Sequence, residues 1–491
     1  MTKIVALAAI ICLCSSGSVW CADLPAEQQN KVIKSVDSYA MRMSEVALKI
    51  WSMPELGYQE TKTSALLQDE LKKAGFRIEA GVADIPTAFV ARAGTNEGPV
   101  IAILAEIDAL PGMSQSATPE RQPIPNQLAG HACGHHLFGS GSVAAAIAIK
   151  NWLAETGTRG QIRLYGTPAE EGGGGKVYMV RAGLFKDVDV TLYWHPSDAN
   201  NASQDRNLAN TSAKFRFHGQ ASHAAVAPDR GRSALDAVEI MNVMVNYLRE
   251  HVPQETRIHY VITNGGAAPN IVPEFAESYY YVRHPDPRIV AEVFERVKKA
   301  AEGAAIGTGT TFDYEVVNGV YSILPNDVLG KVVDSALRRV GAPEWTADEM
   351  TFAAKLQKTL PGRNLPPLAS AKEIRRYQFN AQKYSSTDSG DVSWVTPLAT
   401  LNTVTWVPGT SAHTWQATAA GGMSIGLKGM VVAAKTLALA VAQLFTDPRR
   451  ITAAKAEFNK NRGADFVYRT LIGDRPPPLD YRKNSTGPDA G

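Results

Sequence analysis

Three short apolar runs in the sequence each end in acidic or imidazole side chains beside a proline or glycine turn. They cover residues 99–112, 161–175 and 189–196, and each is typical of a buried strand that runs into a loop. Between the first two lies a Gly/Ala-rich apolar segment, residues 139–154, which predicts a closely packed helix. Buried strands that alternate with helices predict an α/β fold, with a mostly parallel sheet flanked by helices. The polar side chains are then expected beyond the carboxyl ends of the strands, where open α/β sheets keep their sites.

The pattern changes near residue 211 and changes back near residue 326. The intervening segment, residues 211–326, reads as strand, helix, two strands, helix and strand, which is the order of a ferredoxin-like α+β sandwich. We therefore predict a discontinuous main domain, residues 23–210 and 327–460, interrupted by this separate domain. The last residues, 461–491, contain three consecutive prolines and predict an extended Pro-rich tail.

The amino-terminal residues 1–22 have the pattern of a signal peptide: a single lysine, an apolar run of about eleven residues and a weak cleavage zone. The alternative is a membrane anchor, but spanning a membrane needs roughly 18 apolar residues and this run is shorter. We therefore expect an exported protein, periplasmic or secreted, without a stable membrane anchor. Three of the four cysteines lie in this leader, so the mature chain would keep only Cys133 and form no internal disulfide.

The charge balance argues against one large class of partners. Lys+Arg 50 against Asp+Glu 48 give a formal net charge of +2, so the chain lacks the strong field that nucleic-acid binders use. We expect a small-molecule substrate and no nucleic-acid partner.

Four short segments carry the thiol, imidazole and acid groups that metal sites use. They are residues 131–136 (HACGHH), Glu170 with Glu171 ahead of four glycines, His195, and His413. Thiolate, imidazole and carboxylate donors together are what zinc prefers as ligands. Each group alone is more often structural, but three of the four segments follow predicted strands and would meet beyond the same end of the sheet. The sequence therefore predicts a joint metal site.

The adjacent glutamates can divide the work of hydrolysis. Glu171 would hold the metal, while Glu170 would stay off it and accept a proton from the attacking water. Zinc brings the pKa of a coordinated water towards roughly 7, so one carboxylate suffices near neutral pH. Glu170 would then return the proton to the leaving amine, which makes amide hydrolysis the expected reaction.

Segments of the chain between about residue 98 and residue 440 resemble the dinuclear metal amidohydrolase branch of the aminoacylase/carboxypeptidase (zinc peptidase) superfamily, which includes hippurate hydrolases and indole-acetyl-amino-acid hydrolases. The segments are AEIDALPGMSQ, HACGHHLFG, PAEEGGGGK, LYWHP, GRSALDAV, HYVITNGG, STDSGDVSW and GTSAHTWQ. The resemblance implies a zinc-peptidase-like catalytic domain, a lid and dimerisation domain at 211–326, and two divalent ions per subunit, zinc or manganese. It also implies cleavage of the amide bond between an aromatic acyl group, such as p-aminobenzoyl, and an amino acid such as glutamate.

The same resemblance implies roles for individual residues of the catalytic domain. Glu170 would be the general base, and the metal ligands would be Cys133, His135, Glu171, His195 and His413. Asp108 would fix the orientation of a ligand histidine. The roles of Glu106 and His136 stay open, because both depart from the pattern of the family.

The inserted domain would contribute three further residues by the same resemblance. His223 would reach the site across a dimer and stabilise the oxyanion. Asn270 and Arg283 would hold the free carboxylate of the substrate, for which the planar fork of arginine is suited. The assembly would be a homodimer or a heteromer with a paralogous subunit.

Three other functions stay open at this point. The chain could be an exported dipeptidase or N-acyl-amino-acid deacylase, which a panel of substrates would separate from the aromatic amidohydrolase. It could also be a non-catalytic partner subunit, although every expected ligand and Glu170 are present. Finally, Cys133 could be a covalent nucleophile with His135 as its base, but a thiol enzyme has no use for the paired glutamates.

Overall fold

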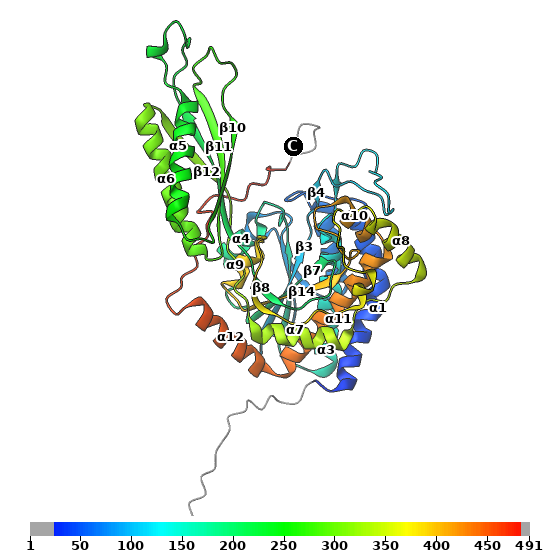
Figure 1. Cartoon of the computed structure of the whole chain (residues 1–491). Helices are drawn as coiled ribbons and strands as arrows, with labels where there is room; N and C mark the ends of the chain where they lie inside the picture. The colour runs from blue at the N-terminus through cyan, green and yellow to red at the C-terminus, as the bar shows by residue number, and fades with distance from the viewer. Residues whose placement is uncertain (1–23, 483–491) are drawn as a thin grey trace, which may run out of the picture.

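The main body of the molecule is built on a six-stranded sheet (Figure 1). In the order of the sheet, the strands are β1 (Arg77–Ala80), β2 (Phe89–Gly94), β6 (Gln161–Thr167), β3 (Val100–Glu106), β7 (Val190–Ser197) and β14 (Leu398–Val404). β6, β3, β7 and β14 are parallel neighbours, whereas β1 and β2 continue the sheet antiparallel at one edge. The computed structural model describes residues 24–482, so the predicted signal peptide, residues 1–22, lies outside the described residues.

Helices flank this sheet and supply most of the core around it. They are α1 (Ala26–Trp51), α2 (Thr61–Lys73), α3 (His135–Thr156), α4 (Gly175–Arg181), α7 (Asp327–Val340), α8 (Ala347–Gln357), α9 (Ser389–Ser393), α10 (Trp415–Gly421), α11 (Ser424–Thr446) and α12 (Pro448–Arg462). α3 and α11 pack against each other and against the strands, and α1 packs against both. Small residues permit this close approach, since a Cβ atom at Gly141 of α3 would lie only 3.0 Å from Met430 of α11 and from Trp194 of β7. The predicted α/β fold is confirmed.

Two of these helices, α3 and α11, are long and apolar enough to cross a membrane by length and composition. However, 83% and 78% of their most apolar windows are buried inside the protein. Both are therefore core helices of the main body.

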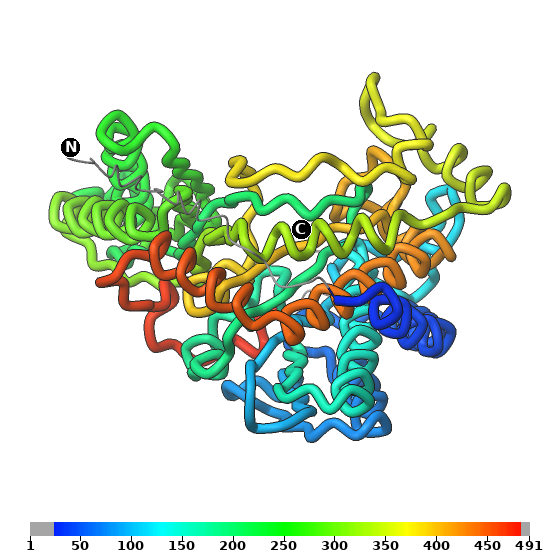
Figure 2. Tube along the Cα trace, turned by 90° about the horizontal axis from the view of Figure 1, so that it is seen from below, coloured from blue at the N-terminus to red at the C-terminus, as the bar shows by residue number. Residues whose placement is uncertain are grey.

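A second, antiparallel sheet forms a separate domain at one side of the main body (Figures 1 and 2). In chain order its elements are β9 (Ala209–His218), α5 (Ala234–Leu248), β10 (Arg257–Asn264), β11 (Phe275–His284), α6 (Pro287–Thr308) and β12 (Thr311–Val320). The strand order is β10-β11-β9-β12, and both helices pack on the sheet around a core of their own that includes Phe215, Val238 and Val293. The predicted ferredoxin-like sandwich is confirmed. The predicted segment 211–326 contains all of this domain except the first residues of β9, and we call it the lid domain.

Short elements complete the described chain. The two-stranded sheets pair β4 (Leu110–Pro111) with β5 (Ala129–Gly130) and β8 (Gln204–Arg206) with β13 (Phe379–Gln382). The 3-10 helices are η1 (Val82–Asp84), η2 (Pro228–Arg230), η3 (Arg249–His251) and η4 (Leu368–Lys372). Residues 463–482, part of the predicted tail, form no helix or strand but return to the main body. There the Tyr481 hydroxyl and the Arg482 guanidinium both donate to the carbonyl oxygen of Glu171.

The strand order places the polar strand ends side by side. Glu106, the last residue of β3, pairs in register with Thr167, the last residue of β6. β7, the other neighbour of β3, carries His195 near its end. The loops that follow these parallel strands therefore open on the same end of the sheet.

Candidate metal centre

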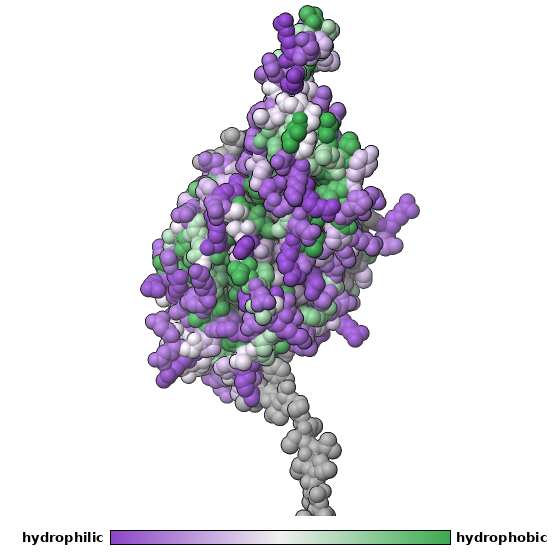
Figure 3. Space-filling model, turned by 90° about the vertical axis from the view of Figure 1, so that its left-hand side faces the viewer, coloured by the Kyte–Doolittle hydropathy of each residue, from purple (hydrophilic) through white to green (hydrophobic). Residues whose placement is uncertain are grey.

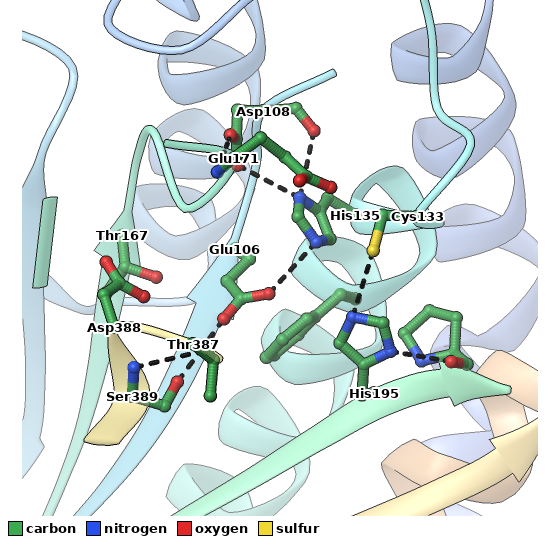
Figure 4. A network of polar contacts seen from close by, with 12 residues as sticks. Glu106, Asp108, Cys133, His135, Thr167, Glu171, His195, Thr387, Asp388 and Ser389 are labelled. Carbon is green, nitrogen blue, oxygen red and sulfur yellow. Dashed lines mark hydrogen bonds and ion pairs between the residues drawn. The ribbon is translucent and has the colours of Figure 1, made fainter. Parts of the chain in front are cut away.

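Cys133 and His135 lie on either side of Gly134, which caps the amino terminus of α3. Gly134 has a φ of +77°, a backbone conformation that favours glycine. A Cβ atom there would also lie 2.8 Å from the ring carbons of Pro196, which follows His195. The tight turn therefore brings the thiol and the imidazole to His195, and Figure 4 shows these three side chains together.

The predicted ligands from four distant segments converge at this point. The Cys133 thiol sulfur lies 3.3 Å from His195 Nε2, and His413 Nε2 lies 3.1 Å from Glu171 Oε1. Three groups each keep their donor atoms within 4.8 Å of one another: Cys133 with His135 and His195, Cys133 with Glu171 and His413, and Glu106 with His135 and Glu170. The first two groups share the thiol, so the arrangement can hold two neighbouring cations.

Unsatisfied buried atoms at the centre of this cluster test whether a cation fits. His135 Nε2 and Glu106 Oε2 lie 3.1 Å apart, yet neither makes a hydrogen bond within residues 24–482. Glu171 Oε1 is also buried without a hydrogen bond there. Buried polar atoms are normally paired, and cations bound within these donor groups would satisfy them. The sulfur, nitrogen and oxygen donor set suits zinc or another divalent transition metal.

Asp108 connects two of the candidate ligands. Its Oδ1 lies 3.0 Å from His135 Nδ1, and its Oδ2 accepts the main-chain N–H of Glu171 at 2.9 Å. A carboxylate on the far nitrogen fixes which imidazole nitrogen is free and how the ring is oriented. Asp108 thereby aims His135 Nε2 into the cluster (Figure 4).

The backbone is strained next to two of the functional side chains. His413 and Ala169, the residue before Glu170, have positive φ values of 61° and 57°. Non-glycine residues in this region cost free energy and persist where the surrounding structure enforces them, often at functional sites. The main-chain N–H of His413 donates to the Ala132 oxygen, which fixes the strained turn beside Cys133.

Burial and neighbouring charges shape the acid–base behaviour of the cluster. Burial, together with Glu106 and Glu171, raises the pKa of Glu170 well above its ordinary value. A raised pKa suits a carboxylate that must take up a proton and give it back near neutral pH. Burial also raises the pKa of the Cys133 thiol, which is the opposite of what activates a nucleophilic cysteine.

A buried ion network behind the cluster contains two residues that the sequence pattern did not single out, Lys176 and Asp388. The Lys176 ammonium lies 2.8 Å from Glu106 Oε1 and 2.7 Å from Asp388 Oδ1, with all three side chains at most 1% exposed. Burial pushes the pKa of Glu106 up, but Lys176 and His135 overcome this effect, so its pKa lies below its ordinary value. Lys176 lies in the segment PAEEGGGGK and Asp388 in STDSGDVSW, two segments that carry the family resemblance. Their position in these segments was the only sequence signal that could have pointed to them.

Glu106 and His136, whose roles the sequence left open, now have locations. Glu106 lies between Lys176 and His135. The His136 imidazole points away from the donors, because its Nε2 lies 3.0 Å from the carbonyl oxygen of Gly421. Burial lowers the pKa of His136 to about 3, so the ring is neutral.

A cavity of about 510 Å³ opens over the cluster. Its lining includes Glu170 and four of the candidate ligands, Cys133, Glu171, His195 and His413, but no residue of the lid sheet. His223 and Asn270 are at the surface in lid-domain loops, where His223 pairs with Ile271 across an isolated bridge. The Arg283 guanidinium lies over the Tyr281 ring within β11. Within one chain, these three predicted residues are therefore not brought to the cavity.

Comparison with known proteins agrees with this fold. Residues 208–308 match the M20 peptidase dimerisation domain. The chain is 40% identical over 438 residues to a subunit of the p-aminobenzoyl-glutamate hydrolase of Escherichia coli, covering 84% of this chain and 91% of that protein. The chain therefore belongs to the M20 peptidase family and is a metallo-hydrolase, which confirms the predicted family.

One further curated relative and two solved structures are also similar to this chain. The chain is 29% identical over 445 residues to the Xaa-Arg dipeptidase of Mus musculus, covering 88% and 92% of the two chains. A dinuclear metal-binding M20 peptidase of Bacillus subtilis shares the fold with a TM-score of 0.58 and 18% identity, covering 84% of this chain and 99% of that one. An aminobenzoyl-glutamate utilization protein of Klebsiella pneumoniae shares it with a TM-score of 0.55 and 19% identity, covering 83% and 97%.

Proposed function

We propose that this chain is a metal-dependent amidohydrolase that cleaves the amide bond between an aromatic acyl group and an amino acid such as glutamate. The observation that carries the proposal is the convergence of Cys133, His135, Glu171, His195 and His413 beside Glu170 in one cavity. The substrate class is supported by the 40% identity to a p-aminobenzoyl-glutamate hydrolase subunit.

The two donor groups that share Cys133 fit two divalent ions, zinc or manganese, held by the five ligands. Bound there, the ions would polarise the amide carbonyl and lower the pKa of the attacking water. Glu170 lines the same cavity, so its carboxylate can accept the proton of the attacking water and return it to the leaving nitrogen. Asp108 holds His135 in the orientation that leaves its Nε2 free.

The proposal gives the three predicted lid-domain residues, His223, Asn270 and Arg283, their roles in a dimer. Exposed apolar side chains on the lid helices, Ile240, Val243, Met244 and Tyr247 of α5 with Ile306 of α6, offer a surface for association. Figure 3 views the molecule from this side and shows apolar side chains on the lid domain. In a homodimer, or a heteromer with a paralogous subunit, His223 of the partner subunit would stabilise the oxyanion. Asn270 and Arg283 would hold the substrate carboxylate.

Hydrolysis of p-aminobenzoyl-glutamate by the purified chain, before and after chelation, tests the proposal. We expect activity that is lost with the metal and restored by zinc or manganese. Glu170→Gln should keep the metal and lose at least roughly 100-fold in kcat, because the proton carrier is removed. Full activity of Glu170→Gln in the assembled complex would show that this chain is a non-catalytic subunit. Activity that survives complete metal removal would refute the metal mechanism.

A dipeptidase is the second candidate, because the chain also resembles the Xaa-Arg dipeptidase over 88% of its length. The same purified protein distinguishes the two functions. Turnover of plain dipeptides, including those ending in arginine, at rates comparable to p-aminobenzoyl-glutamate would favour the dipeptidase.

We also propose that residues 1–22 direct export to the periplasm or the medium, on the sequence pattern alone. Expression of the full-length gene followed by cell fractionation and amino-terminal sequencing tests this. A cytoplasmic protein that retains residues 1–22 would refute it.

A further inference from the structure

Three cationic side chains line the same cavity as the metal cluster. They are Arg206, Arg375 and Lys383, and we call them the cationic wall. Cys133 and His195 also line it, so a substrate bound at the cluster shares this cavity with the wall. None of the three belongs to the metal cluster or to the lid domain.

Two main-chain hydrogen bonds and one to the Gln204 side chain fix the wall to the sheet. The N–H of Lys383 donates to the Arg206 oxygen at 2.7 Å, and the N–H of Arg375 donates to the Asn200 oxygen at 3.0 Å. Gln204, in the same short strand as Arg206, accepts the N–H of Thr400 in β14. β14 pairs in register with β7, the strand that carries His195. The three cations therefore originate from backbone held in a defined position relative to the cluster.

Little of this positive charge is neutralised within the protein. Three carboxylates line the cavity, but Glu170 and Glu171 belong to the metal cluster, and the third, Asp205, lies 3.7 Å from the Lys383 ammonium. Over residues 24–482, Arg206 and Arg375 make no ion pair with an acidic side chain. With Glu170 and Glu171 engaged at the metal cluster, three cations are left with one carboxylate, so the rest of the cavity has an excess of positive charge. Such an excess attracts anionic ligands and repels cationic ones.

We infer that the cationic wall is an anion subsite that selects substrates whose released amino acid has a carboxylate side chain. This inference rests on the proposed amidohydrolase function and assigns its specificity to residues of the same chain. Arg375 and Lys383 bind the side-chain carboxylate, whereas Asn270 and Arg283 hold the carboxylate next to the scissile amide. An amide of arginine would place a cation against the wall and bind poorly.

A matched pair of substrates tests the inference. p-Aminobenzoyl-glutamate and p-aminobenzoyl-glutamine have the same shape and differ in the charge of the side chain. We expect kcat/KM for the glutamate amide to exceed that for the glutamine amide by roughly 10- to 100-fold, the range for hydrogen bonds to a charged group. Equal kcat/KM values for the two amides would overturn the inference and leave the proposed function standing.

Variants of the wall assign this preference to its residues. Arg375→Gln and Lys383→Gln should each lower kcat/KM for the glutamate amide by about tenfold, mainly through KM, and leave the glutamine amide unchanged. Arg376→Gln is the control, since Arg376 is an exposed neighbour that does not line the cavity. Equal losses on both amides in the wall variants would also overturn the inference.

A binding measurement separates the wall from the chemistry. Metal-loaded Glu170→Gln protein should bind p-aminobenzoyl-glutamate more tightly than p-aminobenzoyl-glutamine in calorimetric titrations. The double variant Glu170→Gln, Arg375→Gln should bind the two amides with equal affinity. This result would support the wall even if turnover of both amides were absent and the proposed function failed. Equal affinities of the Glu170→Gln protein for the two amides would refute the inference that the cationic wall is an anion subsite.

Discussion

Replacement of Lys176 by methionine tests whether the buried network stabilises the metal centre. Methionine keeps most of the volume of lysine but removes the ammonium that lies 2.8 Å from Glu106 and 2.7 Å from Asp388. Both carboxylates are at most 1% exposed, so water cannot replace the lost charge. Breaking a buried ion pair by removing one partner costs about 3–5 kcal/mol, and here two carboxylates lose the same partner. We therefore expect the free energy of unfolding of Lys176→Met to fall by at least about 3 kcal/mol.

The pH dependence of this loss follows from the same charges. Without Lys176, burial and mutual repulsion raise the pKa values of Glu106 and Asp388, so the folded variant binds protons more tightly than the unfolded chain. Stability of the variant is then lost as the pH rises, and the difference from the wild type is larger near pH 8 than near pH 5. Urea denaturation at both pH values, on metal-free protein, measures the difference.

An exposed lysine provides the matched control. Lys73 pairs with Asp69 at 2.6 Å, but its side chain is 60% exposed, so Lys73→Met should cost less than about 1 kcal/mol. The double variant of Lys176→Met with Asp388→Asn should recover part of the lost stability, because one buried charge is removed. A loss below about 1 kcal/mol in Lys176→Met at both pH values would refute the reasoning.

Three further changes test other parts of the structure. Gly134→Ala should lower metal content and activity together, because its Cβ would lie 2.8 Å from Pro196 at a φ of +77°; elemental analysis showing full metal content would contradict this. Burial raises the pKa of Asp391 to about 7 from 3.8, so its contribution to stability falls as the pH rises through this interval. As the pH rises from 4 to 7, the free energy of unfolding of Asp391→Asn should therefore increase by up to about 4 kcal/mol relative to that of the wild type. A difference in unfolding free energy that does not change with pH would count against this prediction. Removing residues 463–491 should weaken metal binding in titrations, since the tail donates two hydrogen bonds to the Glu171 oxygen; unchanged affinity would exclude that role.

The strand ends show how far the sequence could predict the site. Apolar runs that end in Glu106 and His195 are typical of buried parallel strands, and parallel strands place their ends together. The turn at Gly134 was visible only as a glycine, because its φ and its contact with Pro196 depend on packing between distant segments. The fold class could thus be predicted from periodicity. The relative positions of the thiol and the imidazoles could be seen only in the assembled structure.

Long-range polar partners could not be predicted from the sequence for the same reason. Lys176 and Asp388 are 212 residues apart, and His136 and Gly421 are 285 apart, so no local pattern joins them. The cationic wall likewise depends on β8 and β13, which are too short to recognise by periodicity. His223, Asn270 and Arg283 lie outside the cavity of their own chain, so their predicted roles depend on a partner subunit.

A crystal structure of the manganese-loaded protein, with anomalous scattering measured above and below the manganese edge, tests the central claim most directly. We predict two anomalous peaks in each protomer, both within coordination distance of the Cys133–His135–Glu171–His195–His413 cluster, with the Glu170 carboxylate free beside them. A single peak, or metal bound elsewhere while these donors stay unligated, would contradict this prediction.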